Sequence, residues 1–89
     1  MIEVGSGAGR HTKRLLKQPR FHTVHCVEMN ESYRKDLENL VGKESVFIEN
    51  VMQHSWRPNY DVVWLSWTFA YLADWEISKL LKEAKKALC

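Results

Sequence analysis

The chain has 89 residues, of which 27% are charged and 45% are hydrophobic, and its formal net charge is +2. This length supports one small domain, and no apolar run approaches the ~20 residues of a membrane-spanning helix. The weak positive charge gives no argument for a nucleic-acid partner. Neither Cys26 nor Cys89 has metal-ligand spacing, and we expect Cys26 to be a buried thiol. A reducing compartment, the cytoplasm or the nucleus, is the simpler expectation.

Predicted strands and helices alternate along the sequence. The first half is expected to contain a strand at 2–4, a glycine-rich turn at 5–9, a helix from 8 or 9 to 17, a strand at 21–28 and a helix from 30 to about 41. The second half is expected to contain a strand at 45–49, a loop at 50–59, a strand at 61–65 and a helix at 74–88. Asn30 and Gly42 would cap the second helix. This order predicts right-handed crossovers and a parallel sheet, which is an α/β fold.

Two segments of the second half carry further expectations. The loop at 50–59 stands where a third crossover helix would lie, and we interpret it as a helix reduced to a turn. The run DVVWL, from Asp61 to Leu65, is apolar almost throughout, which is typical of a strand buried on both faces. Trp64 is therefore expected to pack in the core.

The strongest chemical signal is the loop between the first strand and the first helix. Gly5, Gly7 and Gly9 alternate with small residues, so the backbone can adopt positive φ and a ligand can approach it closely. A nucleotide-like ligand would then lie across the N-terminus of the helix. The spacing is G-x-G-x-G and not the G-x-G-x-x-G of dinucleotide binders, which disfavours a nicotinamide-dependent enzyme. Taken alone, the loop fits a purely structural turn equally well.

Glu28 strengthens the interpretation of that loop. It ends the second predicted strand, 23 residues after Gly5. An acidic residue in this position of a nucleotide-binding α/β unit accepts hydrogen bonds from ribose hydroxyls. Without the glycine loop, Glu28 would be a solvated carboxylate, but the two signals together predict nucleoside binding.

The stretch EVGSGAGRHTKRLL resembles the first motif of class I S-adenosylmethionine-dependent methyltransferases. With YDVVWLSWTFAYLAD, it resembles more narrowly the protein α-N-terminal methyltransferases, which methylate the α-amine of proteins beginning X-Pro-Lys. The resemblance covers nearly all 89 residues. It implies a truncated seven-stranded methyltransferase fold, with a Rossmann-like parallel sheet. Residues 1–89 would form a partial S-adenosylmethionine-binding domain, the N-terminal half of that fold.

The resemblance also implies a set of contacts and two departures. Cofactor contacts would come from Glu3, Gly5, Gly7 and Arg10 at the methionine end, Glu28 at the ribose, Met29, Met52 and Gln53 at the adenine, and Ser66 beside the cofactor. Trp67 would wall the cationic N-terminus of a protein or peptide substrate, and Tyr71 would lie beside it. The family usually has glutamine at Ser66 and a histidine, thought to act as a base, at Tyr71. A tyrosine with its ordinary pKa near 10 is a poor base at neutral pH.

Two functional hypotheses follow for the chain as given. It is either the cofactor-binding part of a methyltransferase or a degenerate methyltransferase domain with a structural or interaction role. Because the sequence stops at Cys89, before the family's later strands, we expect no efficient catalysis by this chain alone. The strand at Asp61 to Leu65 would also be an exposed edge, so we expect self-association or a partner chain there. No metal site is expected, since His11, His22, His25 and His54 lack ligand spacing.

Overall fold

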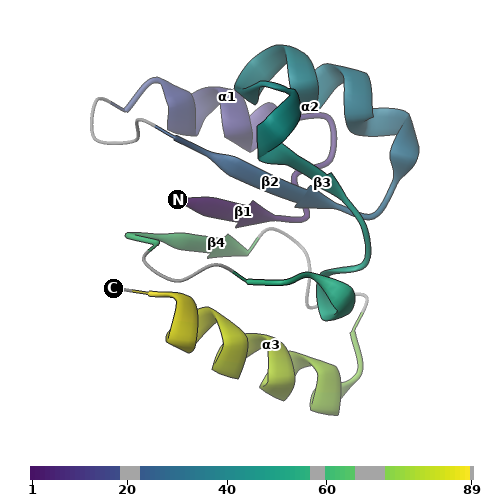
Figure 1. Ribbon diagram of the computed structural model, residues 1–89, viewed down its shortest axis with the longest axis vertical. Coiled ribbons are helices and arrows are strands. Elements are labelled where there is room, and N and C mark those ends of the chain that lie inside the picture. Colours follow the sequence, from purple (N-terminus) through teal and green to yellow (C-terminus); the bar gives the residue numbers. More distant parts are fainter. Residues whose placement is uncertain (19–22, 57–59, 66–71, 89) are drawn as a thin grey trace.

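The computed structural model describes residues 1–18, 23–56, 60–65 and 72–88. Strands β1 (Ile2–Val4), β2 (His25–Glu28), β3 (Val46–Ile48) and β4 (Val63–Leu65) form a sheet in the order β3-β2-β1-β4. The helices are α1 (Arg10–Leu16), α2 (Arg34–Val41) and α3 (Asp74–Ala87), and short 3-10 turns lie at η1 (Glu31–Tyr33), η2 (Lys43–Ser45) and η3 (Val51–Gln53). Helices α1 and α2 cover one face of the sheet and α3 covers the other (Figure 1).

All pairings within this sheet are parallel, which confirms the predicted α/β fold. β1 is central and pairs on both sides, so that Glu3 lies opposite Cys26 of β2 and Trp64 of β4. Because parallel strands end at the same edge, the segments that follow the strands all begin at the carboxyl edge of the sheet. Ligands of open α/β sheets bind at this edge.

The sheet is apolar on both faces, and each face has its own core. Side chains alternate along a strand, so Ile2 and Val4 pack toward α3 while Glu3 faces α1. The cluster on the α1 and α2 side contains Met1, Leu15, Val24, Cys26, Leu37 and Val46. The cluster on the α3 side contains Ile2, Val4, Val27, Tyr60 and Ala87. Completely burying one large aliphatic side chain contributes about 1.5–3 kcal/mol.

The predicted helix caps are present at both ends of the second helical segment. The Asn30 side chain accepts a hydrogen bond from the backbone N–H of Ser32. Gly42 ends α2 with φ of 92°, a conformation that glycine adopts without steric cost. The segment is not one helix, however, because its first turn is the 3-10 turn η1. In residues 50–56, the described part of the loop at 50–59, η3 is a single turn in place of a helix, as expected.

Two expectations for the fourth strand are wrong. β4 covers only Val63–Leu65, and it is not buried on both faces, because Trp64 is 41% exposed. Val63 and Leu65 pack into the core on the α3 side. On the other face, Trp64 lies against the His11 ring at the start of α1, with ring centroids 6.5 Å apart. β4 is the last strand in the described order. A large side chain on such a strand is covered by the neighbouring strand on one side only, so part of it stays exposed.

The other boundaries lie within two residues of the predicted ones, except at the start of the second strand. β2 begins at His25, whereas the sequence predicted a strand from Phe21, which lies outside the described residues. Among the described helices, none combines the length and the hydropathy needed to cross a membrane.

Candidate functional site

The glycine loop joins β1 to α1 at the carboxyl edge of the sheet. Gly5, Gly7 and Gly9 have φ of 76°, 57° and 88°, a region that side chains with a β-carbon disfavour. The backbone N–H of Gly5 donates to the carbonyl of Val27 at 2.8 Å, which extends the pairing of β1 with β2. The N–H of Gly9 donates to the carbonyl of Ser6 at 3.1 Å and closes the turn. The loop therefore needs glycine for its conformation.

Gly7 and Gly9 serve different purposes. A β-carbon built on Gly7 would meet nothing within 4 Å, so this position faces open space. A β-carbon on Gly9 would lie 2.4 Å from Cδ1 of Leu40 and 3.4 Å from Cδ2 of Leu37, both on α2. Gly9 thus allows α1 and α2 to pack closely, whereas Gly7 leaves room for a ligand. The spacing of the glycines in the sequence does not reveal this difference.

Glu28, at the end of β2, is connected directly to the glycine loop. Its Oε1 accepts a hydrogen bond from the N–H of Gly7 at 2.8 Å, and its Oε2 accepts one from the N–H of Asn30 at 2.8 Å. The structure therefore brings Glu28 and the glycine loop together, as the sequence predicted. Each carboxylate oxygen has a second acceptor site, so both remain able to accept a hydrogen bond from a ribose hydroxyl.

Glu3 lies one residue before Val4 and is completely buried. The Thr12 hydroxyl donates a hydrogen bond to its Oε1, and its Oε2 has no partner among the described residues. Burial raises the pKa of Glu3, while the hydrogen bond from Thr12 and the nearby hydroxyl of Ser6 lower it. A buried carboxylate oxygen without a donor is costly, and a cationic group of a ligand would compensate for that cost.

Cys26 lies opposite Glu3 on β2 and is completely buried, as predicted. Burial raises the pKa of its thiol to about 11. The nucleophile in cysteine chemistry is the thiolate, so Cys26 is a packing residue. Within the described ranges no group of three or more His, Cys, Asp and Glu side chains could hold a metal ion.

The fold and the glycine loop agree with a known group of enzymes. The family described as AdoMet dependent proline di-methyltransferase matches residues 1–89. The chain belongs to this family. Its relatives include N-terminal Xaa-Pro-Lys N-methyltransferase 1 of Mus musculus, 31% identical over 93 residues, and that of Homo sapiens, 30% identical. Both alignments cover 98% of this chain and 41% of the relative, so the chain spans less than half of their length.

Solved structures of several methyltransferases share the fold. Phosphoethanolamine N-methyltransferase 1 of Haemonchus contortus, in complex with phosphoethanolamine and S-adenosylhomocysteine, has a TM-score of 0.79 at 22% identity. The match covers 98% of this chain and 19% of that one. A TehB-like SAM-dependent methyltransferase of Corynebacterium glutamicum has a TM-score of 0.79 at 17% identity, covering 98% of this chain and 47% of that one. These similarities confirm the Rossmann-like methyltransferase fold.

The other residues that the family resemblance singled out follow the strands of the same edge. Arg10 is the exposed first residue of α1, Met29 follows β2 and is 68% exposed, and Gln53 is exposed in η3. Ser66, Trp67 and Tyr71, in the segment after β4, lie outside the described residues. Their contacts with a cofactor or substrate stay predictions.

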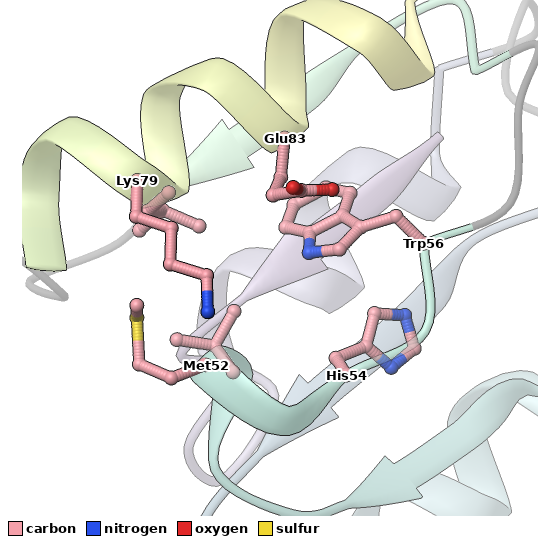
Figure 2. Close-up of a pocket in the computed structure, with 7 residues that line it drawn as sticks. Met52, His54, Trp56, Lys79 and Glu83 are labelled. Atoms are coloured by element: carbon pink, nitrogen blue, oxygen red, sulfur yellow. The ribbon is translucent and has the colours of Figure 1, made fainter.

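Met52 lines a pocket between η3 and α3, whose volume is about 430 Å³ including its open mouth (Figure 2). The residues around it are Val51, Met52, His54, Trp56, Lys79, Leu80 and Glu83. Met52 and Lys79 point toward each other across it (Figure 2). Nδ1 of buried His54 lies 2.6 Å from Oε1 of Glu49, which holds the loop after η3 against the end of β3. Glu3, Gly7 and Glu28 do not line this pocket, so it is separate from the glycine loop.

Replacing Glu28 by alanine is expected to affect both binding and stability. Loss of hydrogen bonds to a charged group should weaken cofactor binding by about 1–3 kcal/mol. The bonds to Gly7 and Asn30 lead us to expect a loss of about 1 kcal/mol in unfolding free energy as well. Isothermal titration with S-adenosylhomocysteine and urea unfolding measure the two effects. Glu28→Gln is the matched control, since it keeps one acceptor, and unchanged affinity in the alanine variant would refute the ribose assignment.

Proposed function

We propose that this protein is the cofactor-binding part of an S-adenosylmethionine-dependent methyltransferase that acts on protein α-amines. The observation that carries the proposal is the contact between Glu28 and the N–H of Gly7, beside open space at the carboxyl edge of the sheet. Membership of the AdoMet-dependent family supports the cofactor. The names of the relatives support a substrate whose N-terminus reads Xaa-Pro-Lys.

The described residues fit this cofactor. The backbone at Gly5 and Gly7 would lie against its methionine part, with Arg10 near the carboxylate. Glu28 would accept hydrogen bonds from the ribose, and the unpartnered Oε2 of Glu3 would face the ammonium. Met29, Met52 and Gln53 would meet the adenine. The bound cofactor supplies the methyl group, and the role of the protein is mainly to place the amine in line with it.

Three residues after β4 would lie near the substrate or the cofactor. Trp67 would form an aromatic wall beside the substrate ammonium, with Tyr71 next to it and Ser66 beside the cofactor. The aromatic wall favours a small cationic terminus over a neutral one. Tyr71 is proposed as a contact residue and not as the base, because the ordinary pKa of a tyrosine is near 10.

We also propose that another strand pairs with β4, supplied by a partner chain or a second copy. The support is the position of β4 at the end of the described strand order, with Trp64 41% exposed. An apolar strand at the end of a sheet favours association at that edge. A cytoplasmic or nuclear location belongs to the same set of proposals, and rests on the free buried thiol of Cys26.

Isothermal titration of the folded chain is expected to show one binding site for S-adenosylhomocysteine. The glycine loop and Glu28 are the reason. Absence of heat in a sample with a cooperative thermal transition would refute the proposal. A radiolabelled transfer assay on a peptide beginning Ser-Pro-Lys then tests this chain for catalysis. Transfer would support an active enzyme and contradict the expectation of no efficient catalysis by this chain alone, whereas binding without transfer is the expected result.

A further inference from the structure

A buried polar pair connects the central strand to α1. Glu3 and Thr12 are both 0% exposed, and the Thr12 hydroxyl donates to Oε1 of Glu3. Oε2 of the same carboxylate is buried without a partner among the described residues. Oε1 is thus bound to a residue of α1, while Oε2 can still accept a hydrogen bond.

We infer that Thr12 is a positioning residue, which orients the Glu3 carboxylate so that Oε2 accepts a hydrogen bond from the α-ammonium of the bound cofactor. This inference rests on the proposed function. The resemblance to the family does not imply this role for Thr12, because packing alone could also fix the orientation of a buried carboxylate.

The geometry explains why a threonine suits this task. The terminal torsion of a glutamate side chain is broad, so a free carboxylate would adopt many orientations. Threonine is stiff at χ1 because of its β-branch, and here it projects from a helix that packs on the sheet. The Glu3 backbone is fixed as well, since β1 pairs on both sides and the Ser6 hydroxyl donates to the Glu3 carbonyl at 3.3 Å.

Thr12 also acts on the charge state of Glu3. Burial raises the pKa of the carboxyl group above its ordinary value, and the hydrogen bond from Thr12 is the largest effect that opposes this rise. The hydroxyl therefore favours the ionised form, and an ionised carboxylate is the stronger acceptor for an ammonium group. Removing the hydroxyl would both release the orientation and favour the neutral acid.

Three ligands separate this role from simple core packing. S-adenosylhomocysteine carries the ammonium and the carboxylate of its amino-acid end. The 3-aminopropyl thioether of adenosine keeps only the ammonium, and 5′-methylthioadenosine has neither group. A positioning role for Thr12 predicts an effect on the first two ligands alone, whereas a packing role predicts an equal effect on all three.

The test is isothermal titration of the full chain and of Thr12→Val with these ligands. Thr12→Val is expected to bind the two amine-bearing ligands about tenfold more weakly and to bind 5′-methylthioadenosine as the wild type does. Thr12→Ser, which keeps a hydroxyl at the same carbon, is expected to restore the preference. An equal loss for all three ligands, or no loss, would overturn the role of Thr12.

Two controls make the remaining outcomes decisive. If Thr12→Val does not fold, Glu3→Gln keeps an acceptor for Thr12 but removes the charge, and an unchanged preference for the amine-bearing ligands would overturn the inference. Wild-type protein that binds all three ligands equally would refute the contact between Glu3 and the ammonium and leave the cofactor site intact. Wild-type protein that binds none of them would refute the proposed function, and this inference with it.

Discussion

Replacing Gly7 by valine is expected to weaken binding of S-adenosylhomocysteine by roughly 100-fold or more, which corresponds to about 2.7 kcal/mol. The position has two properties that lead to this expectation. Its φ is 57°, and a β-carbon there would meet no protein atom within 4 Å. The valine side chain would therefore occupy the space that the glycine loop leaves for the ligand. Isothermal titration measures the loss.

Gly7→Ala is the control that separates strain from obstruction. Alanine shares the backbone cost of a positive φ, about 1–2 kcal/mol per residue, but adds only one methyl group. We expect Gly7→Ala to bind more tightly than Gly7→Val, and both variants to keep a cooperative thermal transition. Wild-type affinity in Gly7→Val would show that the cofactor does not approach the loop at this glycine.

Gly9→Ala is expected to destabilise the fold by about 2–3 kcal/mol. The left-handed backbone contributes about 1–2 kcal/mol. Overpacking against α2 contributes about 1 kcal/mol, the low end of its usual range, because the atom that clashes is the end of the half-buried Leu40 side chain. The added β-carbon would lie 2.4 Å from Cδ1 of Leu40, so that side chain must move. For a small domain this is a large part of the total stability. Urea unfolding measures the change.

A second substitution tests the cause of that loss. Leu40→Ala removes the side chain that the new β-carbon would meet, so Gly9→Ala should cost less in that background than in the wild type. Equal costs in both backgrounds would place the whole effect in the backbone. An unchanged urea midpoint for Gly9→Ala would contradict both causes.

The alternation of strands and helices could be predicted because its signals are local. Asn30 and Gly42 lie where a helix begins and ends, and each satisfies or permits the backbone at that point. The glycine loop and Glu28 could be paired because parallel strands end at one edge of the sheet. These inferences need only the order of residues and the geometry of parallel pairing.

The parts that were wrong, or that the sequence did not predict, depend on how separate segments pack against one another. Trp64 is in an apolar run, but its exposure depends on what lies beside β4. The different roles of Gly7 and Gly9 depend on the approach of α2, and Leu40 is far from both in sequence. The pairing of Glu3 with Thr12 required the contact between β1 and α1. A sequence motif gives no information on which residues of separate segments come into contact.

The central place of β1 determines when this strand can be paired on both sides during synthesis. β1 leaves the ribosome before β2, β3 and β4, yet its partner on one side is β4, about 60 residues later in the chain. At about 5–20 residues per second, that side of β1 stays open for about 3–12 s. Open strand edges in incomplete chains are prone to aggregation. The nascent chain is therefore open to wrong strand pairing at this edge until Leu65 has emerged and β4 can pair.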